Sequence, residues 1–152
     1  MTIRFAVPSD LPAWFALATE ASPIFRHPAD MGDDPDFIAY ARSKTGKNEA
    51  LTAVDETGSH MGFIGFSHNN NRITWFGVFA DHRRKGVGEA LLTKALAELD
   101  HSKPITVETY PEGYVPGVPA KRLYRKAGFT ETESGLVGPH GLTVCRMTLQ
   151  SK

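Results

Sequence analysis

Three consecutive cations followed by a glycine pair form the segment of this sequence best suited to binding a ligand. Arg83, Arg84 and Lys85 precede Gly86-Val87-Gly88-Glu89, where an apolar spacing typical of a helix begins. The first turn of a helix has backbone N–H groups without partners inside the helix, and the positive end of the helix dipole lies there as well. We therefore predict an anion site at this helix start, with phosphate as the expected occupant.

The same segment lacks two common nucleotide-binding patterns. No Gly-Lys-Ser/Thr ends the loop, which excludes a Walker A site. Leu91 stands where the dinucleotide fingerprint needs glycine or alanine. Because Gly86 and Gly88 have no side chains, a ligand can approach the backbone closely.

The elements predicted around this segment describe one mixed α/β (α+β) domain over residues 1–152, with about four helices. Strands are expected at 2–7, 51–54, 61–67, 73–79, 105–109, 129–133 and 142–149. Helices are expected near 11–18, 37–46, 87–99 and 120–127, with loops at 22–36 and 110–119. Because a helix connects strands 73–79 and 105–109, these two should run parallel, whereas the remaining strands are mostly antiparallel.

Composition narrows the class of protein. Seventeen Lys and Arg balance seventeen Asp and Glu, which argues against a polybasic nucleic-acid-binding arm and against acidic disorder. No apolar run reaches the roughly 18 residues of a membrane span, and the start of the chain lacks a signal-peptide pattern. The single cysteine, Cys145, favours a reducing compartment. We expect a cytoplasmic protein that uses neither nucleic acid nor membrane as its main partner, and the six histidines show no metal-binding spacing.

Two sequence signatures resemble those of the GNAT superfamily of N-acetyltransferases. Arg83-x-x-Gly86-x-Gly88, with Val78 five residues upstream and Leu91-Leu92 downstream, is similar to the acyl-CoA signature of that family. The stretch from Ala120 to Phe129, which ends in Gly-Phe, is similar to its second signature. The order of predicted elements also agrees with the family over nearly the whole chain.

The resemblance implies a GNAT-like sheet in which strands 73–79 and 105–109 splay apart and hold the pantetheine arm of acetyl-CoA. The pyrophosphate would lie on the N–H groups of the turn from Arg84 to Gly88. It further implies that acetyl-CoA is the cosubstrate. The histidine spacing and the single cysteine lead us to expect no metal. The implied cofactor-binding residues are Val78, Phe79, Arg83, Arg84, Lys85, Gly86, Val87, Gly88 and Glu89.

The resemblance also implies the reaction, transfer of an acetyl group to a primary amine by direct attack. Tyr124 aligns with the tyrosine often assigned as the acid for the departing thiolate, although its spacing also fits a core position. The family often has a glutamate on the strand that precedes the first signature, and strand 73–79 has none. Glu108 is the expected replacement as base. The alternatives are His68 or a water chain, with Glu108 then a solvent-facing carboxylate.

Several further roles stay open at this point. Gly117 stands where the family often has an asparagine that contacts pantetheine, so that role has no candidate here. The expected acceptor is an amine-bearing small molecule or peptide, and a homodimer is possible in this family. The alternative is a non-catalytic acyl-CoA-binding module. Residues with both a binding and a purely structural interpretation are the acidic loop (Asp30, Asp33, Asp34, Asp36), Tyr110, Tyr114, Arg122 and Arg125.

Overall fold

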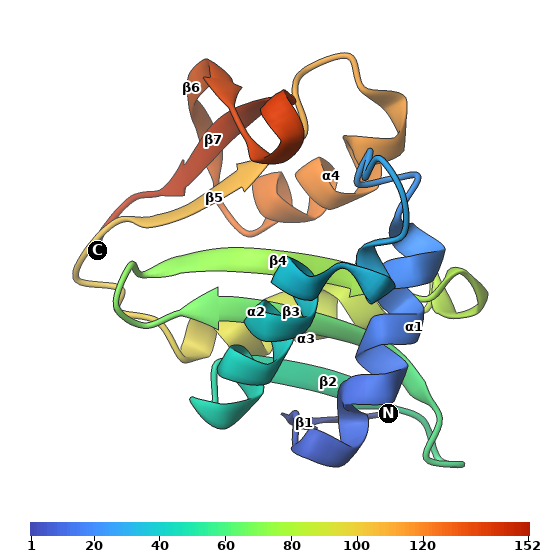
Figure 1. The fold of residues 1–152 in the computed structure, drawn as a ribbon. Helices are drawn as coiled ribbons and strands as arrows, with labels where there is room; N and C mark the ends of the chain where they lie inside the picture. Colours follow the sequence, from blue (N-terminus) through green and yellow to red (C-terminus); the bar gives the residue numbers. More distant parts are fainter.

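Seven strands form one sheet in the order β1-β2-β3-β4-β5-β7-β6 in the computed structural model, which describes residues 1–152 (Figure 1). The strands are β1 (Thr2–Phe5), β2 (Ala50–Val54), β3 (His60–Ser67), β4 (Arg72–Val78), β5 (Ile105–Thr109), β6 (Thr130–Val137) and β7 (Thr143–Leu149). Only β4 and β5 pair in parallel, and all other neighbours are antiparallel. The predicted mixed, mostly antiparallel sheet is confirmed.

Four α-helices cover the sheet, as predicted: α1 (Leu11–Ala21), α2 (Pro35–Gly46), α3 (Val87–Ala97) and α4 (Val118–Lys126). Helices α1 and α2 lie over one face, whereas α3 lies behind the sheet in Figure 1. Each face has its own apolar core. Trp14, Leu17 and Phe63 belong to the α1/α2 side, and Leu91 and Phe129 belong to the α3/α4 side. None of the helices has the length and apolarity that a membrane span requires.

The parallel strands part soon after they meet. β4 and β5 pair only at Arg72 with Thr106 and at Ile73 with Val107. Beyond Ile73 the two strands diverge, as their arrows show in Figure 1. Backbone groups of β4 that face β5 in this part of the strand have no partner on a neighbouring strand. We call the space between Thr74–Val78 and Glu108–Thr109 the wedge.

Several element boundaries differ by a few residues from the sequence-based prediction, and two of these differences have a clear physical reason. Helix α2 begins at Pro35 because the Asp34 carboxylate accepts a hydrogen bond from the Asp36 N–H, and proline suits the first helical position. Strand β6 continues to Val137, past Gly135, with irregular register against β7. Nearly all residues of this edge strand are exposed, so no apolar alternation indicates its length.

Candidate active site

Two neighbouring cavities lie at the wedge. One, of about 600 Å³, has seven aromatic side chains in its wall, and we call it the aromatic cavity. The other, of about 550 Å³, lies over the start of α3, and we call it the basic cavity. Phe25, Phe76, Tyr110 and Ala120 line both. The two cavities therefore adjoin each other at these four residues.

The start of α3 forms the floor of the basic cavity. Gly86 caps the helix in the left-handed conformation (φ 78°), and the first intrahelical N–H bond runs from Ala90 to the Gly86 carbonyl. The N–H groups of the residues between them have no partner in the helix. Basic side chains surround this turn: His82, Arg83, Arg84 and Arg122. Helix starts of this kind commonly bind anions, and anion binding at this one stays a prediction.

The two glycines of the first signature are favoured for different physical reasons. A Cβ at Gly86 would meet no atom within 4 Å, so glycine is favoured there by the positive φ of the backbone. A Cβ at Gly88 would lie 2.8 Å from Leu123 Cδ1 and 3.3 Å from the ring of Phe76. Gly88 thus allows α3 to pack closely against α4 and β4, in addition to lining the cavity.

Most of the predicted cofactor-binding residues lie around the basic cavity. Those that line it are Val78, Arg83, Arg84, Gly86, Val87, Gly88 and Glu89. Phe79 instead packs against the core beneath α1, and its N–H bonds to the Met61 carbonyl. Lys85 is exposed outside the cavity. Of the two α4 arginines, Arg122 lines the cavity, whereas Arg125 pairs with Glu112 at 3.3 Å.

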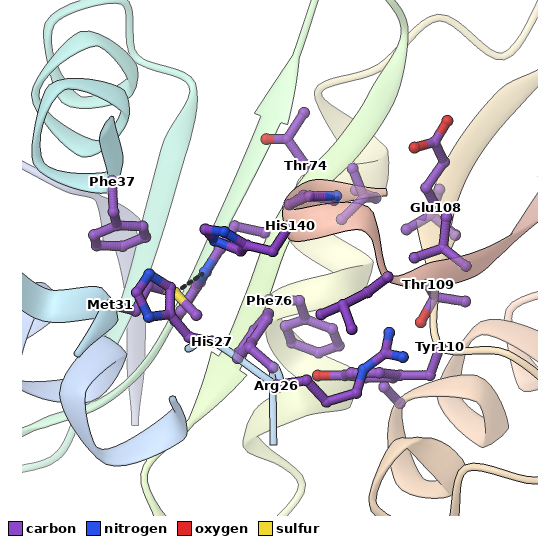
Figure 2. Close-up of a pocket in the computed structure, with 18 of the residues that line it drawn as sticks. Arg26, His27, Met31, Phe37, Thr74, Phe76, Glu108, Thr109, Tyr110 and His140 are labelled. Carbon is purple, nitrogen blue, oxygen red and sulfur yellow. Dashed lines mark hydrogen bonds between the residues drawn. The ribbon is translucent and has the colours of Figure 1, made fainter. Parts of the chain in front are cut away.

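The aromatic cavity lies between the α1–α2 loop, β4, β5 and the β6–β7 turn (Figure 2). Its apolar wall includes Phe25, Phe37, Tyr40, Trp75, Phe76, Tyr110 and Tyr124. The Trp75 indole N–H points to the Met31 sulfur, at 3.4 Å. The Tyr40 hydroxyl bonds to the Thr74 hydroxyl on β4. Thr74 lies on the strand that often bears a glutamate in the family that the sequence resembles, and it supplies only a hydroxyl.

Tyr124 and Glu108, the two predicted catalytic residues, line this one cavity. The Tyr124 side chain is buried and forms no hydrogen bond within the chain; burial, with a smaller contribution from Tyr110, raises the pKa of its phenol. The hydroxyl therefore stays protonated at neutral pH. Its ring also packs against Phe76 and Phe129, with centroids 6.1 and 5.7 Å apart, so the same residue holds a core position.

Glu108 is held by an arginine on the neighbouring strand. Arg146 on β7 lies opposite Glu108, and its Nη2 is 3.2 Å from Glu108 Oε1. The same guanidinium contacts Glu133 at 2.7 Å, so it is shared between two carboxylates. His68, the other sequence candidate for a base, lies in the β3–β4 turn beside Glu49 and lines neither cavity.

A histidine cluster on the aromatic cavity was not indicated as a unit by the sequence. Donor atoms of His27, Asp34 and His140 lie within 4.8 Å of one another. The His27 Nδ1 accepts a hydrogen bond from the Ala29 N–H at 3.0 Å, so its proton is on Nε2, which lies 2.8 Å from Asp34. A histidine that binds a metal through one ring nitrogen normally donates a hydrogen bond through the N–H of the other. His27 has no such second N–H in this tautomer, because its one ring proton points to Asp34. The hydrogen bonds of this cluster therefore stabilise the α1–α2 loop.

Three segments close around Arg26 at the mouth of the wedge. Its Nη2 donates to the Thr143 carbonyl at 3.1 Å, and its guanidinium lies 5.0 Å from the Tyr114 ring centroid. The Tyr114 hydroxyl donates to the Ile24 carbonyl at 2.8 Å. Tyr114 therefore joins the loop after β5 to the α1–α2 loop without lining either cavity.

The Tyr110 ring explains why glycine, and not the asparagine that the resemblance leads one to expect, occupies position 117. A Cβ at Gly117 would lie 2.5 Å from the Tyr110 ring. The ring therefore occupies the space that a side chain at this position needs, and it forms a wall common to both cavities. Burial raises the pKa of the Tyr110 phenol.

The sequence matches the Acetyltransferase (GNAT) family over residues 13–129, and the chain belongs to this family. Its fold is similar to three solved structures, each with 99% of this chain covered. These are yncA from Salmonella typhimurium with its cofactor acetyl-CoA (20% identity, TM-score 0.71, 94% of that chain); a phosphinothricin acetyltransferase from Sinorhizobium meliloti in complex with acetyl-CoA (19%, 0.72, 88%); and Ard1 from Thermoplasma volcanium (21%, 0.73, 97%). A search of curated proteins finds no match.

Proposed function

We propose that the protein is an N-acetyltransferase that moves the acetyl group of acetyl-CoA to a primary amine. The observation that carries this proposal is that the basic and aromatic cavities adjoin at Phe76, Tyr110 and Ala120, with Tyr124 on the aromatic side. Membership of the acetyltransferase family supports acetyl transfer. Two structures of similar fold contain acetyl-CoA, which supports this cosubstrate.

In this proposal the diphosphate binds at the first turn of α3. Backbone N–H groups from Val87 to Glu89 donate to it, and Arg84 and Arg122 supply opposite charge. Neither arginine forms an ion pair within the chain, so both are available to a ligand. The pantetheine arm enters the wedge and uses the unpaired backbone of β4, which brings the thioester to the junction of the cavities.

The acceptor amine occupies the aromatic cavity and attacks the thioester carbonyl carbon. As the tetrahedral intermediate collapses, the C–S bond breaks and the thiolate takes the proton of the Tyr124 hydroxyl. The ammonium form first releases one proton to water, and the neutral amine that attacks then loses a second proton to Glu108, directly or through water, which balances the proton given to sulfur. Since the raised pKa of Tyr124 keeps its phenol protonated, the residue is suited to act as an acid.

Calorimetry with acetyl-CoA and an assay of thiol release across an amine library test the proposal together. We expect saturable binding, and thiol release that depends on the amine. The charge-reversal variant Arg84→Glu should weaken acetyl-CoA binding about ten- to 100-fold, the range of a lost charge-assisted hydrogen bond. Arg42→Glu, on the exposed surface of α2, is the matched control and should bind normally.

Two outcomes would contradict the proposal. Acetyl-CoA binding without turnover on any amine would support the non-catalytic acyl-CoA-binding module. Equal thermal stabilisation by ATP and acetyl-CoA would indicate a general phosphate site. The comparison is sensitive, because a ligand held at 100 times its Kd adds about 2.7 kcal/mol to the free energy of unfolding.

A further inference from the structure

The two cavities carry opposite charge. Arginines dominate the basic cavity, and its one carboxylate, Glu89, is neutralised by Lys126 at 3.0 Å. The aromatic cavity is lined by three carboxylates, Asp34, Asp36 and Glu108, against a single guanidinium. Charge therefore distinguishes what each cavity attracts, and the aromatic cavity favours a cation.

Each of the three carboxylates keeps negative charge despite its neighbours. His27 is neutral in the tautomer that accepts from the Ala29 N–H, so its hydrogen bond leaves the Asp34 charge in place. Arg146 is shared between Glu108 and Glu133, so one of those two negative charges is uncompensated. Asp36, at the start of α2, has no side-chain partner and is exposed at the rim.

The single guanidinium of the aromatic cavity is already committed. Arg26 donates through Nη2 to the Thr143 carbonyl and lies against the rings of Tyr114 and Tyr110. Its Nε is buried without a partner and is closed to a ligand, so only Nη1 is left for a ligand to contact. Arg26 is the only arginine or lysine that lines this cavity, and it cannot offer a carboxylate the bidentate contact that two guanidinium nitrogens provide.

The walls and the mouth of the aromatic cavity limit the size and polarity of its ligand. Stacked Phe25 and Trp75 (centroids 5.1 Å apart) present apolar surface and aromatic faces, which attract cations as well. The α1–α2 loop and the β6–β7 turn meet over the cavity, through the Arg26 bond to Thr143 and the edge contact of the His27 and His140 rings. A volume of about 600 Å³ under this cover suits a small molecule.

We infer that the acceptor is a small ammonium compound with an aromatic or branched apolar body and no carboxylate. The inference rests on the proposed acetyl transfer and narrows it. Asp34 and Asp36 attract the cation at the rim, the aromatic side chains hold its body, and Glu108 faces the amine near the junction. An α-amino acid or a peptide carboxylate would bring a further negative charge into a cavity where three carboxylates already face one guanidinium, and that guanidinium offers no bidentate contact.

A pair of compounds that differ in one group tests the inference. Phenethylamine and phenylalanine share a body and an amine, and only phenylalanine has the carboxylate. We expect kcat/KM with acetyl-CoA to be at least tenfold higher for phenethylamine, and its binding to the CoA-saturated protein to be tighter by a similar factor. Equal or better use of phenylalanine, or of a short peptide through its N-terminal amine, overturns the inference.

Variants of the rim add an independent readout. Asp36→Asn should raise the KM for phenethylamine about two- to fivefold, the scale of one exposed charge pair, with kcat little changed. Asp36→Lys should narrow or reverse the preference against phenylalanine. Asp33→Asn, in the same loop but outside the cavity, is the control and should change neither. An Asp36→Lys variant with the wild-type preference counts against the inference.

The binding arm separates this inference from the proposed function. If phenethylamine binds the CoA-saturated protein in preference to phenylalanine but no acetyl transfer follows, the cavity chemistry stands and the enzymatic proposal falls. If turnover occurs with the opposite preference, the enzymatic proposal stands and the inference falls. Absence of phenethylamine binding to that complex also overturns the inference.

Discussion

Replacing Tyr124 by phenylalanine separates the chemical role of its hydroxyl from the structural role of its ring. The hydroxyl has no hydrogen bond within the chain, and phenylalanine retains the contacts with Phe76 and Phe129. The free energy of unfolding should therefore change by less than about 0.5 kcal/mol, since no paired group is lost. Loss of a proton donor should lower kcat about 100-fold, which corresponds to about 2.7 kcal/mol of activation free energy.

The assay is thiol release at saturating acetyl-CoA and amine, together with thermal unfolding and calorimetric binding of acetyl-CoA. Binding should be unchanged in Tyr124→Phe, because the proposal assigns the hydroxyl to the breaking C–S bond. In the wild type, the raised pKa predicts that deprotonation of Tyr124 causes no loss of rate below about pH 10, the ordinary value for tyrosine.

Tyr114→Phe provides the matched contrast. The Tyr114 hydroxyl bonds to the Ile24 carbonyl, so its loss should cost about 1 kcal/mol of stability and leave kcat near the wild-type value. Wild-type kcat in Tyr124→Phe would refute the assignment of Tyr124 as the acid. A large loss of stability in Tyr124→Phe would show that the hydroxyl has a structural partner.

Three further variants probe the cavities and the fold. Arg122→Glu should weaken acetyl-CoA binding, measured by calorimetry, and the effect should shrink at high salt; a salt-independent affinity would contradict a phosphate contact. Gly117→Asn should displace the tyrosine ring shared by the cavities and cost about 1–3 kcal/mol of stability while raising both KM values, whereas Gly46→Asn, which has open space around it and no positive φ, should do neither. Asp10→Asn should cost about 1–3 kcal/mol, because the buried Asp10 carboxylate accepts charge-assisted hydrogen bonds from the partly exposed Arg4 guanidinium and a hydrogen bond from the Val7 N–H. These hydrogen bonds lower the pKa of Asp10, so its contribution is complete above about pH 4 and is lost on further acidification; the variant should show a flatter acid limb in denaturant unfolding.

The sequence predicts those parts of the site that depend on local structure. The anion site follows from one helix start, since Arg83 to Gly88 are contiguous, and the parallel pair follows from a crossover helix. The placement of Tyr124 and Glu108 in one cavity follows only from the family resemblance, because the two residues lie on different elements. Their catalytic roles remain predictions.

Much of the wall of the aromatic cavity cannot be predicted from the sequence. Arg26 and His27 lie in a loop after α1, and His140 lies in the last turn, more than a hundred residues later. No periodicity relates them, and only the tertiary fold brings them into contact. The sequence shows glycine at position 117, where the resemblance leads one to expect asparagine. The physical reason, the nearby ring of Tyr110, depends on packing and is seen only in the structure.

Because β4 and β5 part, the hydrogen bonds of the sheet can form in two events, folding and ligand binding. Folding completes the ladder elsewhere, while the amides of β4 that face β5 beyond Ile73 gain no strand partner. A ligand with amide groups along its length, spaced like a peptide, would add to this edge much as an extra strand does, each new bond contributing about 1 kcal/mol. Part of the hydrogen bonding that stabilises the sheet would then form only when the ligand binds, and the bound ligand would act as a structural component of the protein.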